Sequence, residues 1–390
     1  MGDLALCAAM RGRISRNTRS VAQLFPAYSY ERPTPVRLLA TPSGATQRLK
    51  ENMAELNGQF RAFPATILCS STDIRFGGDV LYYHENGAPR ILYETCRLSE
   101  RHVIQGLSAD HARIDADIPN DGPRLLLNSA GSFNYGHWLI DDLPRLEAYF
   151  VLRGLHPDET ITILLPSFNA HIDAVRERSI RFYLPKEAAY RVVFLARDQI
   201  YRFAKIYHVT PCSLEPVAKS PEALLAMRVR LLKKTLPYRW AQAARRVAAW
   251  PLNPFSRPGT RLFVDRTPAR GRNLVNREAV LAMLAHEGFE VIDPDFLSVR
   301  QQMVRFAKAR VVVGIMGAAM ANTVFCSAGT RVIYLSPDVR WTDPFFWDLA
   351  AVCGHRYTAL YGTWDTQDAS EAMRAFSVPT ANLRAAFRDI

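Results

Sequence analysis

The sequence contains no run of about 18 or more apolar residues, the length that a membrane-spanning helix requires. Its six cysteines lie far apart and none belongs to a C-x-x-C pair, so cysteine spacing does not indicate a zinc site. No internal repeat or low-complexity tract stands out. Near the N-terminus, the basic residues follow the apolar patch 4–10 instead of preceding it, which is the reverse of a secretory signal. We therefore expect a cytoplasmic protein with reduced thiols.

The chain has 390 residues, 48% of them hydrophobic and 22% charged, which is typical of a globular protein. That length exceeds one ordinary core, so we expect two domains. The formal net charge of +12 suits a phosphate-bearing substrate, a nucleic acid or an anionic membrane surface, and does not choose among them. A basic arm at 11–19 leaves open a peripheral contact with an anionic membrane.

Strand and helix patterns divide the chain at a proline-rich segment, 250–259, which we interpret as a linker. Residues 1–250 would form one domain, which begins with a β-rich segment whose Asn86-Gly87 pair predicts a hairpin turn. Residues 251–390 would form the other. Strands at 261–264, 289–292 and 311–314 alternate there with helices at 277–286 and 297–308. This βαβαβ order predicts a Rossmann-like parallel sheet.

The first candidate site follows a predicted buried strand at 124–128. His137 and Asp141 are four residues apart, so a helical turn would place them on one face near the end of that strand. Ligands of open α/β sheets bind beyond the carboxyl ends of strands. Pro144 requires this turn to be short or kinked. The alternative is structural: Asp141 or Asp142 would cap a helix that begins near Pro144.

The second candidate site is a buried strand that ends at Gly314 and runs into small residues up to Asn322. Small side chains allow a ligand to approach the backbone, and free N–H groups at a helix start favour phosphate. Arg266 and Arg272 would lie at the same sheet rim, where their guanidinium groups suit phosphate oxygens. Close packing of a helix on a strand, with no ligand, explains the small residues equally well.

Two acidic pairs, Asp115 with Asp117 and Asp293 with Asp295, match the D-x-D spacing that metal-dependent sugar transferases use. Such spacings are common in loops by chance, and we expect no metal. In the aromatic tail beyond Ser336, Trp341 is a candidate for stacking on a sugar ring.

Two segments of the chain together match the motifs of one known protein family. The first carries Asn134, Tyr135, Gly136, His137, Trp138, Leu139, Asp141, Leu143, Pro144, Arg145 and Leu146. The second contains Asp265, Arg266, Arg272, Asn276, Glu278, Leu297, Ser298, Gln302, Gly314, Gly317, Ala318, Ala319, Met320, Ala321, Asn322 and Phe325. In these residues the chain resembles glycosyltransferase family 61, and the resemblance covers roughly residues 124 to 337. Met316 stands where many members have histidine, Ala319 where glycine is usual, and Arg277 where an acidic residue is frequent.

The resemblance implies the α/β GT-B fold, in which two Rossmann-like domains face across a cleft, here with an added β-rich N-terminal segment. It also implies inverting sugar transfer from a nucleotide-diphosphate sugar, with a UDP-sugar favoured. The acceptor would be a glycan or a lipid-linked oligosaccharide in the synthesis of bacterial capsule or lipopolysaccharide. No cofactor and no nucleic-acid partner are expected, and the protein would work in the cytoplasm or at the inner membrane face.

The resemblance and the spacing together assign residues to roles. Asp141 and His137 would be catalytic, with Asp141 preferred as the base. The acceptor or its sugar would contact Asn134, Trp138 and Trp341. The donor would contact Arg266, Arg272, Asn276, Gly314, Met316, Gly317, Ala318, Ala319 and Asn322, with Met316 contributing through its backbone. Two alternatives remain: a non-catalytic basic protein that binds glycan or nucleic acid, and a metal-dependent transferase that uses Asp115 and Asp117.

Overall fold

The computed structural model describes residues 15, 17–32, 37–39, 51, 54, 63–77, 79–92, 112–113, 118–129, 131–214, 218–235, 259–266, 271–337, 344–364 and 375–388. The chain divides into two compact units. Unit 1 comprises Met1–Ser29, Arg61–Glu215 and Lys219–Met227; unit 2 comprises Tyr30–Phe60, Pro216–Ala218 and Arg228–Ile390. The division predicted at residue 250 stays a prediction, and the proposed linker, except Gly259, lies outside the described residues.

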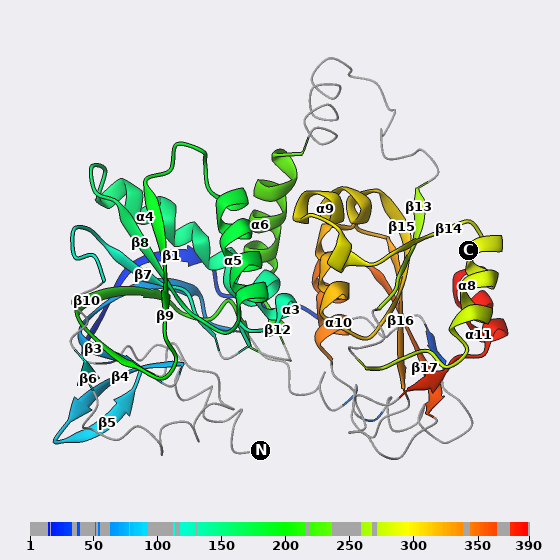
Figure 1. Cartoon of the computed structure of the whole chain (residues 1–390), viewed down its shortest axis with the longest axis horizontal. Coiled ribbons are helices and arrows are strands. Elements are labelled where there is room, and N and C mark those ends of the chain that lie inside the picture. Colours follow the sequence, from blue (N-terminus) through cyan, green and yellow to red (C-terminus); the bar gives the residue numbers. More distant parts are fainter. Residues whose placement is uncertain are drawn as a thin grey trace. The chain divides into compact units, whose positions relative to one another are not determined.

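Unit 1 is built on a sheet with the order β5-β4-β3-β10-β7-β8-β9 (Figure 1). In addition, β1 pairs with β3 and β6 pairs with β10. Strands β7, β8 and β9 are parallel, whereas β1, β3, β4 and β5 are antiparallel to their neighbours. The strands are β1 (Thr18–Phe25), β3 (Thr66–Gly77), β4 (Val80–Glu85), β5 (Ala88–Ile91), β6 (Ala112–Arg113), β7 (Arg124–Leu126), β8 (Ile161–Pro166), β9 (Tyr190–Leu195) and β10 (Ile200–Val209).

The remaining elements of unit 1 surround this sheet or join its strands. Asn86 and Gly87 connect β4 to β5, and both have positive φ, which confirms the predicted hairpin. Ser220 caps the start of the helix α6, because its hydroxyl accepts from the Ala223 N–H at 3.3 Å. These elements are α3 (Tyr135–His137), η3 (Trp138–Asp142), η4 (Leu143–Leu146), α4 (Glu147–Leu155), α5 (Ala170–Tyr183) and β11 (Ser213–Leu214). Two further elements, β12 (Ala218–Lys219) and α6 (Pro221–Lys233), are divided between the units, because the boundaries in the sequence fall after Ala218 and after Met227.

Unit 2 is built on a sheet with the order β14-β13-β15-β16-β17-β18, in which the first five strands in this order are parallel to one another. The N-terminal strand β2 (Arg37–Leu39) also belongs to it, because it pairs with β17. The strands are β13 (Thr260–Val264), β14 (Phe289–Ile292), β15 (Ala309–Ile315), β16 (Arg331–Pro337), β17 (Arg356–Trp364) and β18 (Phe376–Ser377). In chain order the five parallel strands lie 2-1-3-4-5, a doubly wound topology with its switch point between β13 and β15.

Helices cover both faces of this sheet. Figure 1 shows α8 and α11 on one side of the strands and α9 and α10 on the other. Alternate residues of the strands, such as Val311, Val313, Ile333 and Leu335, pack with α8 and α11 in one buried core. The elements are α8 (Arg277–His286), η6 (Pro294–Phe296), α9 (Val299–Lys308), η7 (Ala318–Phe325), α10 (Phe345–Cys353) and α11 (Thr380–Arg388).

The mixed α/β class predicted from the sequence is confirmed, and the βαβαβ order of unit 2 matches the predicted segments closely. The GT-B arrangement of two facing domains stays a prediction. Within the part of the chain that the structure describes, no helix has both the length and the apolar character needed to cross a membrane.

Candidate functional site

The His137 segment is an irregular helix that follows β7. Asn134 caps its start, since its side-chain oxygen accepts from the Gly136 N–H at 2.8 Å. The helix widens to a π turn over η3 and then tightens to a 3₁₀ turn over η4, where Pro144 occupies an early position. Pro144 therefore lies in the first turn of η4, where proline is tolerated, and not in the interior of a longer helix, where it would break a hydrogen bond. π turns are frequent at functional sites.

His137 and Asp141 meet on this irregular helix. The His137 Nδ1 atom lies 2.9 Å from Asp141 Oδ2. The Asp141 side chain is fully buried, whereas the His137 side chain is 22% exposed. The second carboxylate oxygen, Oδ1, accepts a hydrogen bond from the Ser213 hydroxyl at 2.6 Å. A buried carboxylate therefore orients an imidazole that reaches the surface, a pairing common in general-base sites.

The neighbouring Asp142 fixes the turn from the other side. Its Oδ2 atom accepts from the hydroxyls of Ser132 at 2.6 Å and Ser129 at 3.0 Å. Its Oδ1 atom lies 3.6 Å from a guanidinium nitrogen of Arg145. That same Arg145 nitrogen donates to the Asn128 carbonyl at 2.9 Å. The network ties the irregular helix to the segment that follows β7. Asp142 also occupies the N-cap position of η4, with Pro144 in the first turn, so the alternative interpretation is confirmed for the position of Asp142, although its side chain makes no capping hydrogen bond.

Trp138 and Phe133 have opposite environments. Trp138 is fully buried, donates its indole N–H to Ser179 at 2.7 Å, and lies beneath the Arg176 guanidinium at 5.1 Å. Its ring is thus part of the core of unit 1, where it is covered by other side chains and not exposed to a sugar. Phe133, directly before Asn134, is 56% exposed and packs edge-on against Phe168.

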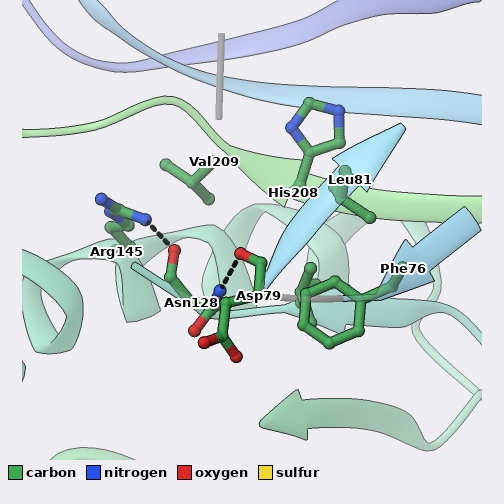
Figure 2. Close-up of a pocket in the computed structure, with 8 residues that line it drawn as sticks. Phe76, Asp79, Leu81, Asn128, Arg145, His208 and Val209 are labelled. Carbon is green, nitrogen blue, oxygen red and sulfur yellow. Dashed lines mark hydrogen bonds between the residues drawn. The ribbon is translucent and has the colours of Figure 1, made fainter. Parts of the chain in front are cut away.

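A small pocket lies beneath the Asp142 network, with room for about one water molecule. Figure 2 shows Arg145, Asn128 and His208 around it, together with apolar side chains. Burial, followed by the nearby Arg145 guanidinium, lowers the pKa of His208 to about 3, so the ring is neutral. Its Nε2 atom lies 2.8 Å from the Ser71 hydroxyl. The pocket is too small for a sugar, and we interpret it as structural.

In unit 2, the second candidate site forms at the switch point between β13 and β15. Arg266 and Arg272 both donate to the Met316 carbonyl, at 3.3 and 2.9 Å. A Cβ atom on Gly317 would lie 2.2 Å from the Arg266 guanidinium, so the absence of a side chain permits this approach. Two cations and the backbone start of η7 thus lie at the carboxyl edge of the sheet, where α/β proteins bind phosphates.

Three other predicted donor-binding residues hold the framework of this site. A Cβ atom on Gly314 would lie 2.0 Å from the sulfur of Met320, so Gly314 makes room for packing. Asn322 is fully buried and donates to the Gln302 side chain at 2.8 Å and to the Ala319 carbonyl at 3.0 Å. Asn276 exchanges two hydrogen bonds with the backbone of Val378, at 2.8 and 3.2 Å. Ala318 and Ala319 open η7 and are half-buried.

Of the candidate residues for binding a metal, a sugar or a membrane, only some lie in the part of the chain that the structure describes. Asp293 accepts from the Asp295 N–H at 3.0 Å and so caps the short helix η6. Trp341, Asp115, Asp117 and, in the basic arm, residues 11–14 and 16 lie outside the described residues, whereas Arg19 lies in β1. In the aromatic tail, Phe345, Phe346, Trp347, Tyr357 and Tyr361 are buried.

Residues 135–333 match the family model described as Glycosyltransferase 61. The chain belongs to this family. The match begins at the helix that carries His137 and ends in β16, so it includes both candidate sites. Membership makes the protein a glycosyltransferase, which in general terms implies a nucleotide-sugar donor and a glycan acceptor. A search of curated proteins found no match.

Sequence reasoning missed Ser213, which belongs to the first site, and the exposure of Phe133, which lies outside it. Ser213 lies in a two-residue strand far along the chain from Asp141, and no spacing connects the two. Phe133 is adjacent to the recognised segment, but exposure of an aromatic side chain cannot be inferred from its position in a loop.

Proposed function

We propose that this glycosyltransferase transfers a sugar from a nucleotide-diphosphate sugar, most suitably a UDP-sugar, to a glycan or lipid-linked acceptor with inversion of configuration. The observation that carries the proposal is the His137–Asp141 couple, in which a buried carboxylate holds a partly exposed imidazole. Such a couple supplies a general base, which attack by a sugar hydroxyl requires.

In this mechanism the imidazole of His137 is the base and Asp141 positions it. With the Nδ1 proton directed to Asp141, the tautomer carries its lone pair on Nε2. That nitrogen takes the proton of the acceptor hydroxyl as the oxygen attacks the anomeric carbon. The nucleoside diphosphate departs from the opposite face. The burial of Asp141 favours this division of roles over direct proton removal by the carboxylate.

Charge on the departing diphosphate would be offset in unit 2. Arg266 and Arg272 offer cationic donors, and the backbone N–H groups of Gly317, Ala318 and Ala319 offer neutral ones. These groups support a reaction in which no metal neutralises the leaving group. We further propose the GT-B arrangement, in which unit 2 binds the donor and unit 1 binds the acceptor across a cleft, with domains of 1–250 and 251–390.

The test compares His137→Ala and Asp141→Asn with a matched control, His156→Ala. His156 also pairs with a carboxylate in unit 1, since its Nδ1 lies 2.6 Å from Glu159 Oε1. We expect both site variants to lose about 100-fold or more in turnover, while UDP binding measured by calorimetry is retained. His156→Ala should keep its activity. Unchanged turnover in His137→Ala would exclude the imidazole as the base.

Two further measurements address the finer parts of the proposal. Full activity in excess chelator would support metal independence, whereas loss that Mn²⁺ restores would favour the alternative with Asp115 and Asp117. Hydrogen exchange with UDP should protect residues near 266–272 and 314–325. The charge of +12 supports placing the acceptor at an anionic membrane surface, as in bacterial capsule or lipopolysaccharide synthesis, on the cytoplasmic side. Sedimentation with anionic vesicles tests this contact.

A further inference from the structure

The strand β14 ends in an unusual surface feature. The first residues after it are Asp293 and the short helix η6, which ends at Phe296. The Phe296 side chain is 82% exposed, more than that of any other large hydrophobic residue in the described part of the chain. A phenyl ring held in water on a three-residue helix contributes little to the core of unit 2. Exposed aromatic rings of this kind are suited to stacking on a flat ligand.

This feature lies on the strand next to the proposed diphosphate site. β14 pairs in parallel with β13, whose carboxyl end carries Arg266, and both strands end at the same edge of the sheet (Figure 1). In doubly wound sheets that bind nucleotides, phosphates occupy the switch point. An acidic residue at the end of the adjacent strand accepts hydrogen bonds from the ribose hydroxyls. Asp293 occupies that position here, directly after Ile292.

A hydrogen-bond chain fixes η6 to the loop of the diphosphate site. The Gln302 amide donates to the carbonyls of Pro294 and Leu297, at 2.8 and 3.0 Å. Its oxygen accepts from Asn322 at 2.8 Å, and Asn322 also donates to the Ala319 carbonyl. Gln302 and Asn322 are both buried. These hydrogen bonds hold the segment with Phe296 at a constant position relative to the start of η7. A ligand that contacts both Phe296 and the start of η7 requires such a constant position.

We propose that Asp293 and Phe296 form the nucleoside subsite of the sugar donor. The Phe296 ring stacks on the base, and the Asp293 carboxylate accepts hydrogen bonds from the ribose 2′- and 3′-hydroxyls. This subsite rests on the proposed function, because it requires the diphosphate of the same donor to bind beside Arg266 and Arg272. The proposal gives Asp293, the first residue of the D-x-D pair with Asp295, a role that does not involve a metal.

The first test measures the affinity of wild type and Phe296→Ala for UDP, CDP, GDP, ADP and inorganic pyrophosphate by calorimetry. Stacking predicts that Phe296→Ala weakens the best-binding nucleoside diphosphate about tenfold and leaves pyrophosphate unchanged. Phe133→Ala is the control, because Phe133 is an exposed aromatic residue of unit 1. It should leave all five affinities unchanged.

The second test uses Asp293→Asn, which retains a side-chain oxygen that can cap η6 and so preserves the local fold. We expect about tenfold weaker binding of the ribonucleoside diphosphate and no change for its 2′,3′-dideoxy analogue, because a charged acceptor to the diol is lost. Equal loss for both ligands would overturn the assignment of Asp293.

These outcomes separate the subsite from the function on which it rests. If pyrophosphate binds and the nucleoside diphosphate retains its full advantage in Phe296→Ala, the subsite is wrong and the diphosphate site stands. If no nucleoside diphosphate binds wild type better than pyrophosphate does, the subsite is again wrong. If neither binds, the proposed function fails, and the subsite fails with it.

Discussion

Ser213 is the residue that most sharply tests the organisation of the first site. Its hydroxyl donates to the Asp141 carboxylate at 2.6 Å. Ser213→Ala removes a donor that stabilises the carboxylate, so Asp141 should hold the His137 proton more strongly. We expect turnover to fall about tenfold and the acid limb of the pH–rate profile to move to higher pH.

A matched control exists in the same unit. Ser167 donates to the Asp173 carboxylate at 2.7 Å, far from the His137 couple in sequence. Ser167→Ala should therefore leave the pH–rate profile unchanged. An equal drop in turnover for Ser167→Ala and Ser213→Ala, with no movement of either profile, would mean that Ser213 has only a structural role.

His208 predicts a pH dependence of stability. Its pKa is about 3 in the folded protein and about 6.5 in an unfolded chain, because burial and the Arg145 charge disfavour the protonated ring. The unfolded state therefore binds the proton more readily. The contribution of His208 is fully present above pH of about 6.5 and declines as the pH falls from there toward 3. Its limiting slope is about 1.4 kcal/mol per pH unit.

Urea unfolding at several pH values checks this slope against His208→Gln, which does not titrate. The difference between the two proteins should change with pH below about 6.5 and stay constant above it. A pH-independent difference would show that the buried ring gains its proton without a penalty.

At the scale of elements, Gly317 connects the end of β15 to η7 where Arg266 approaches the backbone. Gly317→Ala would place a methyl group on the guanidinium, which must then move. We expect about tenfold weaker binding of UDP, because charge-assisted hydrogen bonds to phosphate depend on orientation. Gly154→Ala, in α4, meets open space and should leave UDP binding unchanged with equal or slightly higher stability.

Element boundaries in unit 2 follow closely from the sequence, because runs of branched apolar residues and helix caps act locally. The predicted bounds of α8 and β14 agree with the structure, and Ser298 caps α9 within the predicted segment. The π turn of η3 could not be predicted in the same way. It arises because Pro144, the Asp142 network and the core position of Trp138 must be satisfied together.

The residues of the sites were harder to predict than the elements, because a spacing does not distinguish contact with ligand from support of the backbone. Asn276, Asn322 and Trp138 fit the family pattern, yet each makes hydrogen bonds within the protein. His137 and Asp141 were predicted to meet, and they do. Their four-residue separation sufficed because helical turns of either width keep such residues on one face.

At the scale of the whole molecule, the N-terminal segment of unit 2 predicts an effect on stability. The Arg32 guanidinium donates to the fully buried Asp348 at 2.9 Å, and the Tyr30 hydroxyl donates to the same carboxylate. Arg32→Met leaves that charge without its cation. We expect the free energy of unfolding of unit 2 to fall by about 3 kcal/mol, measured by urea unfolding.

The double variant Arg32→Met with Asp348→Asn removes both charges, so it should recover much of the lost stability. No recovery would mean that Arg32 acts through its packing over Trp347, which lies 5.5 Å from the guanidinium carbon.

The pairing of β2 with β17 also has a consequence for biosynthesis. β2 ends at Leu39 and its partner β17 begins at Arg356, so most of the polypeptide separates them. On the ribosome, the early strand must wait about half a minute for that partner at usual elongation rates. During this interval the backbone N–H and C=O groups of β2 have no partner strand. We expect the nascent chain to avoid pairing with other chains only if synthesis is completed quickly or a chaperone covers this strand.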